Sequence, residues 1–327
     1  MPVVKTSLEP LRGRRIAVLG YGSQGRAQAR CLADSGLDVV IGLRDGSSTG
    51  PIVERDGLRP AGLEHACRGA DLIAFMLPDR EQPAVFEAAV RPALIAGTTL
   101  LFAHGFNIRF DRIRPPPEVD VVLVGPKAPG PMLRAVFERG GGVPALVAVE
   151  RDASGEAWDR TGAYAAGIGS HRAGIIRSTF AEETETDLFG EQAVLAGGAG
   201  ALVKAGFEVL VEAGYQPEAA YFECVHELKL VVDLLAERGY EGLRRSISEV
   251  ARHGSMTRGE VIIDAQVRIR MRKVLDDIRS GAYVAEWSAE ADAGYPRVEA
   301  AIREESESLI ERTGRAIRAM TPGREET

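Results

Sequence analysis

The chain has few cysteines and no long uncharged apolar run. Its 327 residues include 3 cysteines, too few for a disulfide framework, so a reducing cytoplasm is the expected location. No uncharged apolar stretch approaches the roughly 18 residues of a membrane span, and the first residues contain no apolar stretch of signal-peptide length. The net charge of −7 argues against a nucleic-acid or anionic-membrane partner. These exclusions leave a soluble protein, and the chain is long enough for two domains.

Lysine is also scarce. Only five of the 40 basic residues are lysine, and the others are arginine. Codon usage explains such a bias without reference to function. Where arginine is the default cation, however, a lysine in a constrained loop carries more information. Lys127 is such a residue, because it lies in the segment GPKAPGP directly after a predicted strand.

The first half of the chain alternates apolar runs with helix-like segments. This pattern predicts a parallel sheet covered on both faces, in the order of a doubly wound, Rossmann-like α/β domain. The expected strands are residues 15–20, 38–43, 71–77, 98–103, 120–125 and 144–149. From about residue 180 the strand pattern ends, and amphipathic helices are expected over residues 186–205, 207–213, 217–238, 258–280 and 297–319. The sequence therefore predicts two domains, 1–179 and 180–327, of which the second is all-helical.

A G-x-G-x-x-G segment lies where the first strand is expected to run into a helix. It consists of Gly20, Tyr21, Gly22, Ser23, Gln24 and Gly25. In this position it predicts dinucleotide binding rather than an incidental turn, because the helix N-terminus favours the pyrophosphate. An NAD site usually has an acid after the second strand, whereas Arg44 stands here, followed by the hydroxyls of Ser47 and Thr49. These residues favour the ribose phosphate of NADP, and Asp45 leaves some use of NAD open.

Two predicted helices carry carboxylates four residues apart, Asp187 with Glu191 and Glu223 with Glu227. Each pair shares a helix face, where like charges cost about 0.2–0.5 kcal/mol. Solvated faces are the simple alternative, with Asp187 in a helix N-cap. The face of the second pair, however, continues through the apolar residues Leu230, Val231 and Leu234. Carboxylates on a buried stripe need a cation, and oxygen ligands without clustered Cys or His favour magnesium or manganese.

Two residues stand at the ends of predicted strands, where open α/β sheets bind their ligands. His104 follows the run 98–103 in AHGFN, and Lys127 follows the run 120–125. A strand-end histidine alone is as often structural as functional. Together, the two residues predict the rim of an active site.

These segments resemble the ketol-acid reductoisomerase (acetohydroxy acid isomeroreductase) family in its short, class I form. The resemblance extends over most of the chain, and EETETDLFGEQAVLAGG and AYFECVHELKLVVDLL are its most specific parts. GYGSQGRAQA, FAHGFNI, GPKAPGP and RRSIS agree with it. The resemblance implies a knotted helical C-terminal domain, an exception to the usual absence of knots. It also implies a homodimer or higher homo-oligomer with shared active sites.

The resemblance implies roles for individual residues. His104 and Lys127 match catalytic residues, and Ser248 matches a substrate contact. The ligands of two magnesium ions are matched by Asp187, Glu191, Glu223 and Glu227. Besides the glycine segment, cofactor contacts are matched by Arg44, Ser47, Thr49, Asp79, Gln82 and Gly130. In the implied dimer, Glu223, Glu227 and Ser248 come from the neighbouring subunit.

The implied reaction is the magnesium-dependent alkyl migration of a 2-acetyl-2-hydroxy acid, such as 2-acetolactate or 2-aceto-2-hydroxybutyrate. Reduction by NADPH then gives a 2,3-dihydroxy acid in branched-chain amino-acid biosynthesis. Residues 249–255 (EVARHGS), next to Ser248, depart from the family's usual NTAEYGD. A divergent paralogue that acts on a related acetohydroxy acid in a specialised pathway is therefore an alternative. A metal-free hydroxyacid dehydrogenase and a non-catalytic nucleotide-binding oligomer are the other hypotheses.

Overall fold

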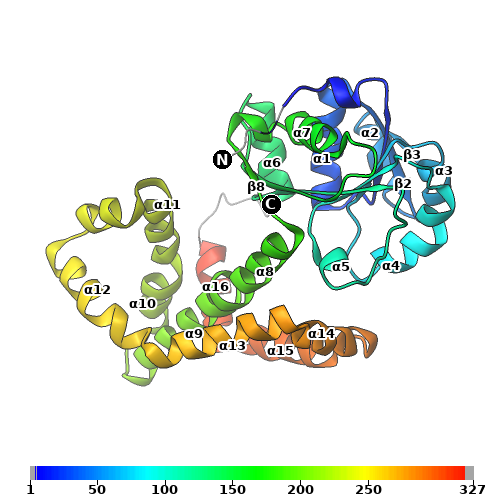
Figure 1. The fold of residues 1–327 in the computed structure, drawn as a ribbon. Coiled ribbons are helices and arrows are strands. Elements are labelled where there is room, and N and C mark those ends of the chain that lie inside the picture. The colour runs from blue at the N-terminus through cyan, green and yellow to red at the C-terminus, as the bar shows by residue number, and fades with distance from the viewer. Residues whose placement is uncertain (1–3, 5, 321–327) are drawn as a thin grey trace. The chain divides into compact units, whose positions relative to one another are not determined.

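The computed structural model describes residues 4 and 6–320, in two units (Figure 1). The units comprise Met1–Thr186 and Asp187–Thr327. Helix α8 (Phe180–Gly190) begins where the sequence placed the start of the second domain, and the two units divide within this helix.

The first unit is built on an eight-stranded sheet with the order β3-β2-β1-β4-β5-β6-β7-β8. The strands are β1 (Arg15–Leu19), β2 (Asp38–Leu43), β3 (Arg59–Gly62), β4 (Leu72–Phe75), β5 (Thr99–Phe102), β6 (Asp120–Pro126), β7 (Ala145–Arg151) and β8 (Ile175–Arg177). Strands β1 to β6 are parallel, with β1 between β2 and β4. This order confirms the predicted doubly wound α/β fold.

The sheet departs from the predicted parallel arrangement at one edge. Strand β7 runs antiparallel to β6, and β8 is parallel to β7. The chain returns to the end of β6 before β7 begins. The backbone N–H of Lys127, just after β6, donates to the carbonyl of Pro144, just before β7, at 2.8 Å. From that point β7 must run back along β6. The apolar pattern of a strand carries no information about its direction.

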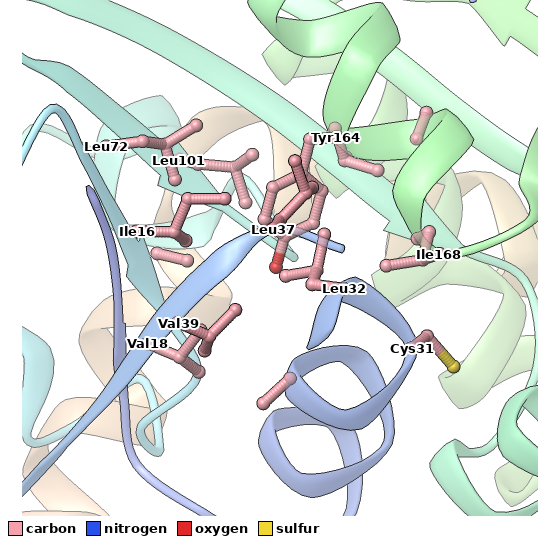
Figure 2. Close-up of a cluster of buried hydrophobic side chains, with 14 of the residues drawn as sticks. Ile16, Val18, Cys31, Leu32, Leu37, Val39, Leu72, Leu101, Tyr164 and Ile168 are labelled. Atoms are coloured by element: carbon pink, nitrogen blue, oxygen red, sulfur yellow. The ribbon is translucent and has the colours of Figure 1, made fainter. Parts of the chain in front are cut away.

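Helices cover both faces of the sheet. One face packs against α1 (Ser23–Asp34), α6 (Gly130–Glu138) and α7 (Ala157–Gly167). Figure 2 shows this core, in which Ile16 and Leu72 of the strands meet Leu32 of α1 and Tyr164 of α7. The buried Tyr164 hydroxyl donates to Oε1 of Gln28 at 3.0 Å, as a buried phenol requires.

The other face packs against shorter helices. These are α3 (Leu63–Cys67), α4 (Gln82–Val85) and a following π-helical turn (Phe86–Val90), while α2 (Gly50–Arg55) and α5 (Phe106–Arg109) complete the unit. The rings of Phe75 and Phe102 stack with centroids 4.7 Å apart. Phe180 meets the ring of Phe102 edge-on at 6.3 Å. This contact anchors the first turn of α8 beside the end of β5.

The described residues of the second unit form helices and no strands, as predicted. After α8 come a π-helical turn (Glu191–Leu195), α9 (Gly197–Glu212), α10 (Pro217–Tyr221), a second π-helical turn (Phe222–His226), α11 (Glu227–Ser246), α12 (Glu249–Ile262), α13 (Ala265–Ser280), α14 (Ala282–Asp292), α15 (Pro296–Glu307) and α16 (Leu309–Met320). Its small core contains Phe207, Ala220, Tyr221 and Ile317. The knot implied by the family resemblance stays a prediction.

Large apolar side chains of the second unit are exposed in the single chain. The stripe predicted to be buried on α11 is an example, since Leu230 is 56% and Val231 41% exposed, and Glu223 and Glu227 are exposed as well. That prediction is therefore wrong for one copy. The stretch Phe180–Glu212 is also long and apolar enough to cross a membrane by length and composition, and only 6% of its most apolar window is buried. Exposed apolar surface of this extent is typical of an interaction site.

Candidate active site

The glycine segment forms a tight turn between β1 and α1. Gly20 has a φ of +95°, and a Cβ on it would lie 2.9 Å from the carbonyl oxygen of Met76. A Cβ on Gly25 would lie 2.4 Å from the carbonyl oxygen of Gly20, so α1 packs too closely here for any other residue. A Cβ on Gly22 would meet nothing within 4 Å. Gly22 thus faces open space, as a segment that receives a pyrophosphate requires.

A cavity of about 470 Å³ opens beside this turn, at the carboxyl ends of the strands. It brings together most of the predicted cofactor contacts and one predicted catalytic residue. Its lining includes Gly20, Tyr21, Gly22, Ser23, Gln24, Arg44, Ser47, Thr49, Asp79, Gln82 and His104. Its position between the turns after β1 and β4 is the point at which strand order reverses, where doubly wound folds bind dinucleotides.

The loops around the cavity are fixed by side-chain hydrogen bonds. The Ser47 and Thr49 hydroxyls lie 2.7 Å apart in the loop after β2. After β4, Nε2 of Gln82 donates to the carbonyl of Leu77 at 2.9 Å and to Oδ1 of Asp79 at 3.2 Å. The buried Asn107, which the sequence analysis did not single out, donates to Oε1 of Gln82 at 2.9 Å. Gln82 therefore shapes the pocket wall through these contacts.

Gln24 and Gly130 hold the lysine-bearing loop against the glycine turn. Nε2 of Gln24 donates to the carbonyl of Ala128 at 2.8 Å. A Cβ on Gly130 would lie 2.1 Å from the carbonyl oxygen of Ser23, so only glycine allows α6 to begin so close to the turn. Gly130 lines a neighbouring cavity of about 450 Å³ rather than the larger one.

One buried carboxylate joins the two predicted catalytic residues. Oε2 of Glu183 lies 3.1 Å from Nδ1 of His104, and Oε1 lies 3.1 Å from Nζ of Lys127. The backbone N–H of Gly105 also donates to Oε2 at 3.0 Å. The Glu183 side chain is 2% exposed, against 22% for His104 and 36% for Lys127. The ends of β5 and β6 and the first turn of α8 thus converge on one acid.

The electrostatics of this cluster keep Glu183 ionised. Burial alone would raise the pKa of Glu183, but the hydrogen bond with His104, the charges of His104 and Lys127 and the Gly105 N–H outweigh it and lower the pKa. An ionised carboxylate only accepts hydrogen bonds, so Nδ1 of His104 is assigned the proton that it shares with Glu183. The cluster therefore joins two proton-carrying groups through one negative charge.

The predicted metal ligands are only partly assembled in the single chain. Asp187 is one turn beyond Glu183 on α8, and the ligand atoms of His104, Glu183 and Asp187 lie within 4.8 Å of one another. Among residues 4 and 6–320, no other group of three or more acids, histidines or cysteines has metal-binding spacing. Glu191, Glu223 and Glu227 are not brought into such a group.

Both acidic pairs adjoin a π-helical turn. Glu191 is the first residue of one turn, Glu223 lies in the other, and Glu227 follows it as the first residue of α11. Such turns are rare and occur frequently at functional sites in helices. Within the second unit, burial and then the charge of Glu191 raise the pKa of Tyr283 in α14. Glu191 thus interacts electrostatically with a partly buried phenol.

Comparisons with known proteins decide the family. A family model described as the NADPH-binding domain of acetohydroxy acid isomeroreductase matches residues 10–174. A model described as the C-terminal domain of ketol-acid reductoisomerase matches residues 180–323. The chain belongs to the ketol-acid reductoisomerase family. It is therefore an enzyme of branched-chain amino-acid biosynthesis, both oxidoreductase and isomerase, with a domain for a nicotinamide cofactor.

Solved structures agree with this assignment. An NADH-preferring ketol-acid reductoisomerase from an uncultured archaeon is 43% identical to this chain, with a TM-score of 0.93, and the match covers 97% of this chain and 98% of that one. A semialdehyde dehydrogenase NAD-binding protein from Cupriavidus necator, in complex with calcium and NAD, is 17% identical, with a TM-score of 0.62. It covers 82% of this chain and 99% of its own, and this second likeness is one of fold alone.

Glu183, at the centre of the cluster in this ketol-acid reductoisomerase, was missed by the sequence analysis. It precedes Asp187 by four residues in EETETDLFGEQ. The four-residue spacing that singled out Asp187 and Glu191 therefore also includes Glu183, and this spacing could have identified it. Glu183 adjoins Glu182 and Glu185, and the sequence does not indicate which of these acids is buried.

The predicted substrate contact, Ser248, begins helix α12. Its Oγ accepts a hydrogen bond from the backbone N–H of Ala251 at 3.2 Å, which makes it an ordinary N-cap. Its hydroxyl proton can still be donated. In the altered segment that follows, Arg244 donates to the hydroxyl of Ser255. Ser248 thus has a structural role in this chain that is compatible with the predicted contact.

Proposed function

We propose that this enzyme converts 2-acetyl-2-hydroxy acids, 2-acetolactate foremost, into 2,3-dihydroxy acids by alkyl migration and reduction with NADPH. The observation that carries the proposal is the contact of Glu183 with both His104 and Lys127 beside a nucleotide-sized cavity. Alkyl migration needs a hydroxyl proton removed, and the later reduction needs a proton supplied. An acid–base network with two proton carriers suits both steps.

The chain's own groups move and hold protons in this scheme. Glu183 stays ionised and accepts the Nδ1 proton of His104, so proton transfer by this imidazole is assigned to Nε2. The ammonium of Lys127 donates to Oε1 of the same carboxylate and is the second proton carrier of the network. Because His104 lines the cavity, its ring is placed at the edge of the cofactor pocket.

Asp187, Glu191, Glu223 and Glu227 would hold the two magnesium ions. The donor set fits, because all four residues offer the hard carboxylate oxygens that magnesium prefers. The position of Asp187 beside the buried Glu183 and the π-helical turns at both acidic pairs support this assignment. When bound, the ions act as Lewis acids toward the hydroxyl and carbonyl oxygens of the substrate.

NADPH is the proposed reductant, although the 43% identical relative prefers NADH. Support comes from Arg44, which lines the cavity with the paired hydroxyls of Ser47 and Thr49. A guanidinium beside two hydroxyls suits a ribose 2′-phosphate. The Arg44→Gln variant is therefore expected to raise KM for NADPH about 10–100-fold, the size of one lost charge-assisted contact, and to leave KM for NADH nearly unchanged. Initial rates with each cofactor measure this.

Arg59→Gln is the matched control for Arg44→Gln. Arg59 pairs with Asp38 on the surface. Its replacement removes one positive charge, as Arg44→Gln does, but away from the loop that carries Ser47 and Thr49. We expect its KM values to match those of the wild type for both cofactors. Equal losses of NADPH and NADH affinity in Arg44→Gln would count against a phosphate contact. A wild-type preference for NADH would overturn the NADP assignment itself.

We infer a homodimer or larger homo-oligomer that packs through the second unit and shares its active sites. Leu195, Val209 and Leu230 are 70%, 63% and 56% exposed in one copy, an unfavourable arrangement for apolar side chains in water. The mass in solution is expected to be at least twice 35.1 kDa by sedimentation equilibrium. Leu230→Asp should lower it and reduce activity, whereas Ile95→Asp, at an exposed site of the first unit, should not. A wild-type monomer would contradict the inference.

The enzyme is proposed to work in a reducing, cytoplasmic environment, with a small-molecule substrate and without a nucleic-acid or membrane partner. Cys31, Cys67 and Cys224 are free thiols, and the first two are buried. Burial raises the pKa of Cys67 to about 12, so this thiol is unreactive. Neither buried thiol is available for a disulfide.

A cofactor-oxidation assay tests the proposed reaction. It uses a panel of 2-acetyl-2-hydroxy acids, with magnesium and with a chelator. Magnesium-dependent turnover of 2-acetolactate supports the proposal. Turnover of a related acid alone favours the divergent paralogue, to which the altered segment 249–255 points. Activity in the chelator would indicate a metal-free dehydrogenase, and cofactor binding without any turnover would indicate a non-catalytic oligomer.

A further inference from the structure

Three side chains form a network beside the glycine turn. The hydroxyl of Tyr21 donates to Oδ2 of Asp56 at 2.8 Å. Arg26 donates two hydrogen bonds to the same carboxylate from one edge of its guanidinium, from Nε to Oδ2 at 2.7 Å and from Nη2 to Oδ1 at 3.0 Å. The Asp56 side chain is 11% exposed, and Tyr21 is buried. The carboxylate thus accepts three hydrogen bonds, of which two form a bidentate pair.

The network connects the two walls of the cofactor cavity. Tyr21 lies inside the glycine turn, between Gly20 and Gly22. Asp56 ends helix α2, and Thr49 of the hydroxyl-bearing loop begins it. Tyr21 and Thr49 both line the cavity of about 470 Å³. Asp56 therefore ties the far end of α2, and through it the loop that carries Ser47 and Thr49, to the turn after β1.

The protonation states in the network are fixed at working pH. The hydrogen bond from Arg26, above all, lowers the pKa of Asp56 to about 2. Burial, and then the hydrogen bond to Asp56, raise the pKa of the Tyr21 phenol. The acid is thus a permanent acceptor and the phenol a permanent donor, so the network holds throughout the pH range in which the enzyme works.

We propose that Asp56 and Arg26 are positioning residues that set the affinity for the dinucleotide by holding Tyr21 and helix α2 at a fixed spacing. The proposal rests on the cofactor site proposed above. Asp56 lines neither cavity, so it acts through Tyr21 and α2, and Arg26 lines only the neighbouring cavity of about 450 Å³. An ordinary surface ion pair contributes little. This pair differs because its carboxylate is nearly buried and shared with a buried phenol of the binding turn.

The test compares dinucleotide binding with turnover. Asp56→Asn, Arg26→Gln and the double variant are titrated with NADPH and assayed at saturating NADPH. We expect the dissociation constant for NADPH to rise about 3–30-fold in each single variant, less than for the loss of a direct charge-assisted contact with the cofactor, because the network acts through Tyr21 and α2. In Asp56→Asn and Arg26→Gln, kcat should stay within about twofold of the wild type, because the reacting groups are untouched. The double variant should bind NADPH no more weakly than Asp56→Asn, because both substitutions disrupt the same network.

Two further variants make the test decisive. Tyr21→Phe removes the phenol hydroxyl alone and should also weaken NADPH binding. Glu87→Gln breaks a comparable bidentate pair with Arg91, away from the cavity, and should leave binding unchanged. If Asp56→Asn does not fold, Tyr21→Phe and Arg26→Gln carry the test. Unchanged NADPH affinity in the folded variants, or a loss of kcat without a loss of affinity, would overturn the proposal. Failure of the wild type to bind either dinucleotide would instead overturn the proposed function.

Discussion

Replacing Glu183 with Gln is expected to lower kcat for the complete conversion of 2-acetolactate by about 10²–10⁴-fold, the range of positioned acid–base groups. Glutamine has the same length and can still accept the Gly105 N–H. It has no charge to balance Lys127 and no carboxylate oxygen to fix the His104 tautomer. Steady-state kinetics at saturating magnesium and cofactor measure the loss. KM for NADPH should change little, because Glu183 does not line the cavity.

Glu182→Gln is the control for this experiment. Glu182 precedes Glu183 on the same helix, is exposed and accepts a hydrogen bond from the hydroxyl of Ser178 at 2.7 Å. We expect its kcat to stay within about twofold of the wild type, as is usual for an exposed surface contact. Thermal unfolding of both variants shows whether the buried amide disrupts the fold. Equal activity of the two variants would mean that the Glu183 cluster is structural rather than catalytic.

The sequence predicted strands where apolar runs are long and uninterrupted. Strand β2 spans the six residues expected, and β1 ends one residue earlier than expected. Two strands were missed, β3 (RPAG) and β8 (IIR), because each is short and pairs at an edge of the sheet. Edge strands need no continuous apolar run, since only one side of their backbone is paired.

The rim of the site was predictable because strand order alone brings His104 and Lys127 to one edge of the sheet. The acid between them was not predictable in the same way. Its position depends on where α8 begins and on the ring of Phe180, which packs edge-on against Phe102. A Cβ on Gly105 would lie 2.4 Å from Oγ1 of Thr184, so the approach of α8 also depends on this glycine. Such contacts are tertiary and leave no periodic trace in the sequence.

The stripe on α11 shows another limit of periodicity. The pattern identified an apolar face that begins at Glu223 and Glu227. It does not indicate whether the same chain covers the face. In one copy Leu230 and Val231 remain exposed. Hydrophobic periodicity detects a surface that must be buried, and the partner that buries it can be a second copy.

Replacing Glu191 with Gln is expected to abolish isomerisation, with turnover of 2-acetolactate reduced at least about 100-fold. Loss of a residue that only hydrogen-bonds a metal ligand already lowers metal affinity or activity about 10–100-fold. Glu191 is proposed as a direct ligand. The amide keeps one oxygen but loses the negative charge that attracts a divalent cation. Reduction of a ready-made 2-keto acid should persist more weakly, because hydride transfer comes from the cofactor. Separate assays of the two half-reactions distinguish these outcomes.

The magnesium dependence of the Glu191→Gln variant separates a ligand from a structural acid. A weakened ligand set should regain part of its isomerase activity as magnesium is raised, whereas a disrupted fold should not. Glu237→Gln, an exposed acid of α11 outside the predicted ligand set, should need no extra magnesium. The pKa of Tyr283 gives a readout apart from catalysis, because the Glu191 charge raises it and the amide should let it fall. A lower Tyr283 pKa with wild-type isomerase activity would place Glu191 beside Tyr283 but exclude it from the metal ligands.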